Sequence, residues 1–135
     1  MNDNVFIDTN ILVYAYSVTE PFKQSTASKL LSTGSVFIST QVLQELANTL
    51  NRKFKVDWNQ INEVLLECSK NFSIHTNTEY TIAKACLFAK TYNYSFYDSL
   101  IISAALQTSS NILYSEDMHN GHLIEGKLKI CNPFI

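Results

Sequence analysis

Glycine and proline are scarce in this chain, with three glycines and two prolines among 135 residues. These residue types make flexible linkers and long mobile loops, so their scarcity favours a single compact domain over residues 1–135. A chain of this length buries a sizeable core without disulfides or structural metals. Hydrophobic residues make up 46% of the chain and charged residues 16%, which excludes a disordered chain and a coiled coil.

Cysteines and long apolar runs are also few. The three cysteines, Cys68, Cys86 and Cys131, are widely spaced and form no Cys/His ligand pattern, which favours a reduced, cytoplasmic compartment. No apolar run approaches the ~20 residues that span a bilayer, and no basic segment precedes an apolar one near residue 1. We therefore expect neither membrane insertion nor secretion.

A strong excess of positive charge is missing as well. The formal net charge of −2 argues against a protein that holds nucleic acid mainly through its phosphates. If four of the acids surrounded a cation, however, the remaining surface would be mildly basic. Net charge therefore does not exclude a nuclease.

Short apolar runs alternate with longer segments of helical spacing. Five runs predict short buried strands: Val5–Ile7, Val36–Ser39, Phe72–His75, Ile112–Tyr114 and Leu128–Cys131. Between them apolar residues recur at helical spacing, as Val42, Leu46 and Leu50 do. This alternation predicts an α/β fold, a three-layer α/β/α arrangement with a mostly parallel sheet of about five strands.

Asp8 directly follows the first predicted strand and precedes Thr9 and Asn10. A carboxylate at the carboxyl end of a buried strand lies where open α/β sheets bind their ligands. The same residues also suit the N-cap of a helix that begins near Ile11. Both roles stay open at this point.

Three further acids are placed to join Asp8. Glu45 lies beside the apolar stripe of the helix after the second strand and has no basic partner at helical spacing, although a solvated helix charge is the alternative. Asp98 falls in the first turn of an apolar helix, three residues after Ser95, which also suits helix capping. Asp117 follows the fourth strand, where a turn residue is the alternative. Strand ends and helix starts meet at one edge of a doubly wound sheet, so we expect the four carboxylates to converge.

Converging carboxylates repel one another unless protons or a cation neutralise them. Oxygen-only ligands favour Mg²⁺ or Mn²⁺, and Mg²⁺ typically takes one or two carboxylates together with waters and substrate phosphate oxygens. Such a cation lowers the pKa of a coordinated water and neutralises the charge that develops on phosphorus oxygens. The pattern predicts metal-assisted phosphodiester hydrolysis with Asp8 as the central ligand.

Two other functions remain open. Asp8 could accept a phosphoryl group covalently, as in phosphatases built on similar sheets, but such enzymes usually carry an acid two residues later, where this chain has Asn10. The second alternative is a catalytically inactive fold that binds RNA or a protein. The presence of all four acids counts against it.

Four segments resemble the motifs of the PIN-domain family, specifically the toxin ribonucleases of toxin–antitoxin pairs. They are Phe6–Leu12, Val42–Leu46, Tyr97–Leu100 and Ser115–Asp117, and the resemblance covers essentially the whole chain. It implies a Mg²⁺- or Mn²⁺-dependent endoribonuclease that acts on RNA, commonly forms a homodimer and is inhibited by a small antitoxin.

The resemblance assigns roles to individual side chains. The implied metal ligands or water activators are Asp8, Glu45, Asp98 and Asp117. The implied polar support for them comes from Thr9, Asn10 and Ser115. Where many members carry a further acid, this chain has Asn120, and Glu116 is expected to point away from Asp117.

Basic and aromatic residues suggest substrate contacts. Possible phosphate contacts are Arg52, Lys53 and Lys55, with a solvated helix end as the alternative. Possible base-stacking residues are Tyr92, Tyr94, Phe96 and Tyr97, with core or dimer contacts as the alternative. We expect His119 and His122 on the surface, because their spacing in a probable turn is poor support for a zinc pair.

Overall fold

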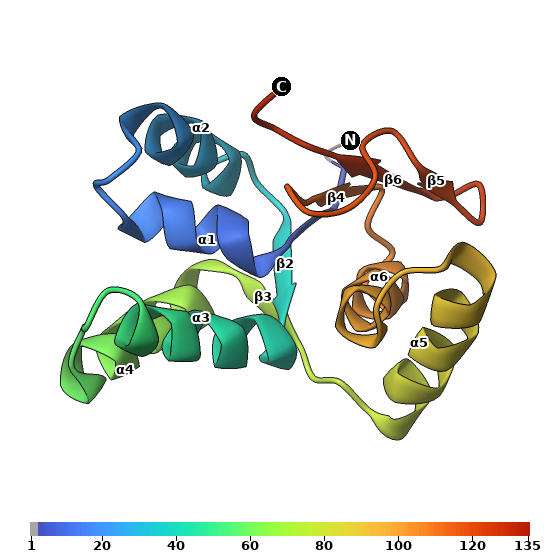
Figure 1. Cartoon of the computed structure of the whole chain (residues 1–135), viewed down its shortest axis with the longest axis horizontal. Coiled ribbons are helices and arrows are strands. Elements are labelled where there is room, and N and C mark those ends of the chain that lie inside the picture. Colours follow the sequence, from blue (N-terminus) through green and yellow to red (C-terminus); the bar gives the residue numbers. More distant parts are fainter. Residues whose placement is uncertain (1–2) are drawn as a thin grey trace.

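A six-stranded sheet crosses the computed structural model, which describes residues 3–135 (Figure 1). Its strands are β1 Val5–Ile7, β2 Val36–Ser39, β3 Ser73–His75, β4 Ile112–Tyr114, β5 Leu123–Ile124 and β6 Leu128–Cys131. The strand order is β3-β2-β1-β4-β6-β5. β1 pairs in parallel with both β2 and β4, and β5 pairs antiparallel with β6. The predicted mostly parallel α/β sheet is confirmed.

The sheet differs from the expected five strands at one edge. β5 has only two residues, and it returns to β6 through a tight turn in which Gly126 has a positive φ of 67°. A two-residue strand is too short to show an alternating or continuous apolar pattern. At the other edge β3 begins at Ser73, because Phe72 instead closes the preceding helix and donates its N–H to the Cys68 carbonyl.

The described part of the chain contains six helices. They are α1 Thr9–Tyr16, α2 Pro21–Leu31, α3 Thr40–Arg52, α4 Trp58–Asn71, α5 Glu79–Tyr92 and α6 Phe96–Gln107. Figure 1 shows α1 to α4 on one side of the strands and α5 with α6 on the other. Helices contact one another mainly within these two groups. The predicted three-layer arrangement is therefore present.

Polar side chains cap the first turns of α3 and α5. Ser39 accepts a hydrogen bond from the Val42 N–H at the start of α3, and Thr78 forms a capping box with Thr81 at the start of α5. Such caps satisfy backbone donors that the first helical turn leaves without partners. The Ser39 cap fixes where α3 begins relative to β2, and therefore which face of α3 is directed toward the sheet.

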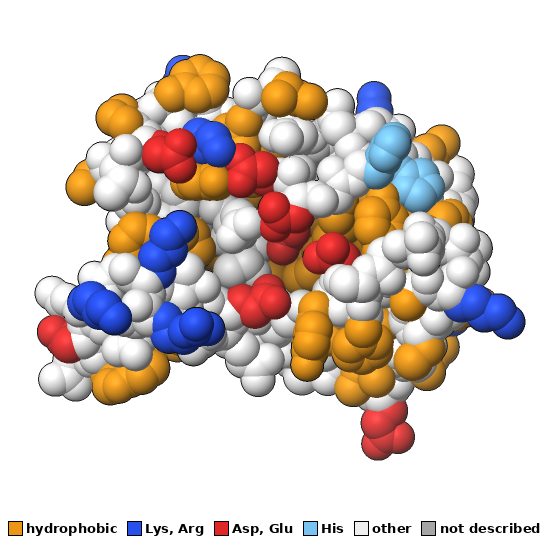
Figure 2. Space-filling view, viewed as in Figure 1, with side chains coloured by type: hydrophobic (Ala, Val, Ile, Leu, Met, Phe, Trp, Pro, Cys, Tyr) orange, Lys and Arg blue, Asp and Glu red, His pale blue; other side chains and the backbone are white. Residues whose placement is uncertain are grey.

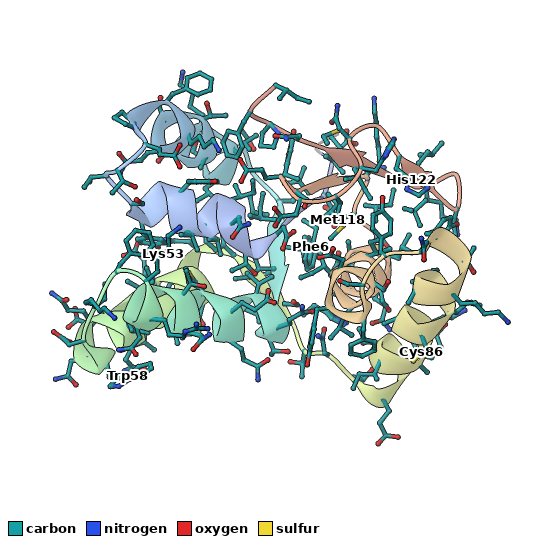
Figure 3. The ribbon with its side chains drawn as sticks, in the orientation of Figure 1. Phe6, Lys53, Trp58, Cys86, Met118 and His122 are labelled. Atoms are coloured by element: carbon teal, nitrogen blue, oxygen red, sulfur yellow. The ribbon has the colours of Figure 1, made fainter. Side chains whose placement is uncertain are left out.

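The core fills the space between the sheet and the two helical layers. Figure 3 labels Phe6 of β1 and Met118, which follows β4, near the middle of the molecule, and both are buried. α6 is buried along most of its length, from Ser99 to Ala105. Its burial on several sides explains why this segment reads as nearly continuously apolar rather than as an amphipathic stripe. Within residues 3–135 no helix is both long enough and apolar enough to cross a membrane.

Two leucines on strands allow the contribution of the central sheet to the free energy of unfolding to be compared with that of its edge. Leu113 of β4 is fully buried, whereas Leu123 of β5 is 54% exposed. We expect Leu113→Ala to lower the free energy of unfolding by about 2–5 kcal/mol, because it leaves a cavity in the core. Leu123→Ala should change it by no more than about 0.5 kcal/mol. Urea denaturation measures both, and equal losses would show that the core is not centred on β4.

Candidate active site

The four predicted carboxylates line one pocket at the carboxyl end of β1. The pocket has a volume of about 270 Å³, and Asp8, Glu45, Asp98 and Asp117 all contribute to its wall. They come from the end of β1, the middle of α3, the first turn of α6 and the segment after β4. Figure 2 shows acidic side chains around a hollow in the middle of this face. The structure thus brings the four acids together, while their role as metal ligands stays a prediction.

Asp8 caps α1, which begins at Thr9 and not near Ile11, and it also lines the pocket. Its Oδ1 accepts a hydrogen bond of 2.7 Å from the Thr9 N–H, at the N-cap of α1, and its Oδ2 accepts one of 2.8 Å from the Ser115 hydroxyl. The side chain is only 7% exposed. Helix capping and a place in the pocket wall are therefore compatible, because the carboxylate has two oxygens.

Burial changes the proton affinity of this carboxyl group. It raises the pKa of Asp8 to about 7, and the negative charges of Glu45 and Asp98 act in the same direction, against the hydrogen bonds from Ser115 and Thr9. Burial also raises the pKa of Asp98, and the negative charges of Asp117 and Glu45 raise it further. The pocket is therefore a place where a proton or a cation is favoured.

Hydrogen bonds hold Glu45 in place from two sides. The Thr9 hydroxyl donates to Glu45 Oε1 at 2.5 Å, and Gln41 Nε2 donates to Glu45 Oε2 at 3.4 Å. Gln41 Nε2 also donates to the backbone carbonyl of Tyr97 at 3.2 Å, which links α3 to α6. Residues of α1 and α3 therefore orient this carboxylate, and α6 contributes only through Gln41.

Asp117 and Asp98 are fixed differently. Asp117 is exposed, and its Oδ2 accepts a hydrogen bond of 2.7 Å from Asn10 Nδ2 while its N–H donates to Ser115 Oγ at 3.3 Å. Ser95 caps α6: its hydroxyl oxygen accepts a hydrogen bond of 3.1 Å from the Asp98 N–H, and the Asp98 carboxylate lines the pocket. Asp98 therefore lies in the capped first turn of α6, with its side chain in the pocket wall.

The oxygen donors of the pocket suit a hydrated divalent cation. Across residues 3–135 no three His, Cys, Asp or Glu side chains form a group that could hold a metal ion by themselves. Mg²⁺, however, keeps several waters and needs only one or two carboxylates. Gln41 also lines the pocket, and its buried Oε1 has no hydrogen-bond partner within the described chain, so it can accept from a metal-bound water. The pocket fits a hydrated cation held partly through water rather than a closed metal cage.

The pocket wall includes residues that were not proposed as site residues. They are Gln41, Asn48, Thr49 and Ile101. Three of them lie four residues before and three and four residues after Glu45 on α3, and Ile101 lies three residues after Asp98 on α6. Residues at these spacings share a helical face. Helical periodicity taken from the predicted acids would therefore have found all four.

Neither Asn120, which stands where many family members carry a further acid, nor the nearby Glu116 lines the pocket. Glu116 points away from it, as expected, and forms an ion pair of 2.5 Å with Lys23 and accepts a hydrogen bond of 2.6 Å from the Tyr14 hydroxyl. Asn120 Oδ1 accepts a hydrogen bond from the Asn132 N–H. Both side chains have structural partners elsewhere.

Two of the three predicted basic residues lie beside the pocket. Arg52 and Lys53 line a second depression of about 360 Å³ together with Asn48 and Thr49, which also line the acidic pocket. Figure 2 shows basic side chains on the same face as the acids, and Figure 3 labels Lys53 at the far end of α3. Lys55 lies outside both linings and has a positive φ of 58°. The two depressions thus share a wall.

The likeness to known proteins covers most of the chain. A model of the PIN domain family matches residues 5–119. No curated protein matches the chain. The solved structure of VapC20 from Mycobacterium tuberculosis, described as a toxin that cleaves the sarcin-ricin loop, is similar over 84% of this chain and 90% of that one, with 19% identity and a TM-score of 0.70.

Two other solved structures are similar over nearly their full length. A toxin–antitoxin complex from Klebsiella pneumoniae matches with 17% identity and a TM-score of 0.74, over 96% of this chain and 98% of that one. FitAcB from Neisseria gonorrhoeae matches with 17% identity and a TM-score of 0.67, again over 96% and 98%. At these identities the three structures show a shared fold.

The raised pKa of Asp8 predicts a specific pH dependence of stability. A pKa raised from 3.8 to about 7 means that the folded state binds the proton more tightly than the unfolded chain does. The stabilisation is complete below the ordinary pKa and is lost as the pH rises through the folded value. As the pH of metal-free protein rises from about 4 to about 8, the free energy of unfolding of Asp8→Asn should therefore increase relative to that of wild type. The relative increase should exceed about 1.4 kcal/mol, which corresponds to one pKa unit.

Denaturation of both proteins in the presence of a chelator measures this difference. Asp3→Asn, which removes an exposed carboxylate outside the pocket, is the matched control and should follow wild type. A constant difference between Asp8→Asn and wild type across this pH range would show that Asp8 titrates normally.

Proposed function

Because the chain belongs to the PIN domain family, we propose that it is a metal-dependent endoribonuclease. The observation that carries the proposal is the single pocket in which Asp8, Glu45, Asp98 and Asp117 converge beside a basic depression. An acidic centre favours a divalent cation, and adjoining cationic side chains favour a phosphate backbone.

The proposed mechanism divides the work among the pocket residues. The residues that would hold Mg²⁺, or Mn²⁺ in its place, partly through water, are Asp8, Glu45, Asp98 and Asp117. When bound, the ion supplies an activated water and neutralises charge on the phosphate. The Asp98 carboxylate lines the pocket and would be placed to take a proton from the attacking water.

Second-layer hydrogen bonds orient these carboxylates. Thr9 and Gln41 restrict Glu45, Asn10 restricts Asp117, and Ser115 restricts Asp8. Held in this way, the acids need little rearrangement when the substrate phosphate arrives. Covalent catalysis by Asp8 is disfavoured because residue 10, two positions later, is an asparagine and not an acid.

We also propose that the protein is the toxin of a toxin–antitoxin pair and acts on RNA in the cytoplasm. Two of the structures with this fold are a toxin–antitoxin complex and an RNA-cleaving toxin by their descriptions, which supports a small antitoxin as partner. A homodimer is the assembly that the family resemblance implies. Sedimentation of the purified chain, alone and with a candidate small antitoxin, measures both associations.

Loss of the central carboxylate tests the catalytic proposal. We expect wild-type protein to cleave RNA only with Mg²⁺ or Mn²⁺, and Asp8→Asn to lower kcat by at least about a thousandfold, because one removed electrostatic contact already costs a factor of about a hundred to a thousand. Expression in cells followed by mapping of RNA ends reads out the same change. Growth arrest and discrete new ends are expected with wild type alone.

The matched control is Asp3→Asn, which removes an exposed aspartate outside the pocket and should cleave as wild type does. Metal-dependent cleavage by Asp8→Asn at the wild-type rate would refute the catalytic role. RNA binding without cleavage by any of the proteins would instead favour the inactive binding module.

The basic depression predicts a separate effect on substrate binding. Arg52→Ala and Lys53→Ala should each raise KM for RNA with kcat unchanged, because they remove cations that face phosphates rather than the reacting atoms. Each lost contact to a single strand should also make the slope of log K against log salt less steep by about 0.7. Lys90→Ala, an exposed lysine at the end of α5, is the control. An unchanged salt slope in both variants would exclude phosphate contacts there.

A further inference from the structure

Four ring-bearing side chains enclose an open pocket that the catalytic proposal does not use. Tyr92 and Tyr94, from the end of α5 and the connection to α6, face His119 and His122, from the segment between β4 and β5, around a volume of about 330 Å³. Figure 3 labels His122 beside this connection, and Figure 2 shows histidine side chains on the same face as the acidic hollow. A single extended ligand on this face could therefore contact both the pocket and the acids.

The four rings form the walls of the pocket and pack against one another through His122. The His122 plane stands nearly perpendicular to those of Tyr92, at 79°, and His119, at 82°, and is tilted by 35° from that of Tyr94. The ring centroids in these pairs lie 5.1 to 6.1 Å apart, so a bound ring would pack on the pocket-facing sides of the four rings and not between two of them. The Tyr94 hydroxyl lies 2.8 Å from His122 Nδ1, which fixes the imidazole in its orientation. The pocket walls are thus held in place before a ligand binds.

The lining favours a nucleobase over a phosphate. Its side chains are flat and carry polar edges, and no lysine or arginine contributes to it. Flat aromatic and imidazole surfaces are what proteins use to stack single-stranded bases, whereas phosphates are held by cations.

The walls of the ring pocket lie close in sequence to two of the acids, although the two pockets share no lining residue. His119 lies two residues after Asp117, and Tyr94 lies four residues before Asp98. A nucleotide whose base occupied the ring pocket would therefore place its sugar-phosphate backbone next to these two carboxylates. This connection distinguishes the pocket from an isolated aromatic patch.

We propose that the pocket formed by Tyr92, Tyr94, His119 and His122 binds an unpaired base of a single-stranded RNA, adjacent to the phosphodiester that is cleaved. The proposal rests on the proposed ribonuclease function for the identity of the ligand. It adds a base subsite on the side of the acids opposite Arg52 and Lys53, so that the strand crosses the acidic pocket between a basic and an aromatic contact.

The three histidines of the chain provide a direct binding measurement. In a chelator at about pH 8, a single-stranded hexaribonucleotide should shift the NMR signals of the His119 and His122 rings through the ring current of the bound base. His75, whose Nε2 lies 3.2 Å from Thr81 Oγ1 outside the pocket, is the internal control and should not move. An abasic hexamer with the same backbone should leave all three signals unchanged.

The outcomes separate the possible ligands. Equal shifts with the abasic hexamer would mean that phosphates bind there, and no shift with either oligomer at saturation would mean that no nucleic acid binds; either result overturns the proposal. A shift limited to the base-containing oligomer supports it even if the protein cleaves no RNA, so failure of the catalytic proposal is recognised separately.

Kinetics provide a second measurement on active protein. His119 is exposed, so His119→Ala removes little packing, and we expect it to raise KM for RNA by about tenfold with kcat unchanged, in line with the loss of one stacked base. Tyr80→Ala, which removes an exposed aromatic ring elsewhere on α5, should keep the wild-type KM. A wild-type KM in His119→Ala would contradict the base subsite.

Discussion

The buried carboxylate of Asp8 is the constraint around which the pocket is built. It ends the central strand β1, caps α1 through one oxygen and accepts the Ser115 hydroxyl through the other. Burying a carboxylate is costly, and the two hydrogen bonds offset only part of that cost, since the pKa remains well above its ordinary value. Because Glu45 and Asp98 add further negative charge, the arrangement favours binding of a proton or a cation. An energetic cost at the centre of the fold is thereby linked to the proposed chemistry.

The first turn of α1 carries much of the remaining organisation. Thr9 donates to Glu45 of α3, and Asn10 donates to Asp117 after β4, so adjacent residues orient two acids that are far apart in the sequence. The cap by Asp8 fixes the start of this turn, and its position sets the direction of both side chains. A short sequence segment therefore couples the end of the central strand to two other elements. Displacement of α1 would disturb several acids together.

The five longer strands and the acids beside them could be predicted from the sequence, whereas the two-residue edge strand β5 and the ring pocket could not. The buried strands and the acids at their ends produce continuous apolar runs followed by carboxylates, a pattern that parallel sheets impose. β5 was not predicted because it has only two residues, which are too few to show a periodic apolar pattern. The pocket around His122 depends on rings from segments far apart in the sequence, and no local spacing encodes that contact. For Asp8, helix capping and a place in the pocket were alternatives, whereas the structure combines them because the carboxylate has two oxygens. At α6 the cap is Ser95, which leaves the Asp98 carboxylate in the pocket wall.

The proposed catalysis depends on a divalent cation at the acidic pocket, and binding of the cation can be examined without any assay of activity. Crystals grown with Mn²⁺ and measured for anomalous scattering would locate the ion. We expect a peak within the pocket lined by Asp8, Glu45, Asp98 and Asp117, with waters completing its coordination. An empty pocket at saturating Mn²⁺, or a peak only at His119 and His122, would contradict the account.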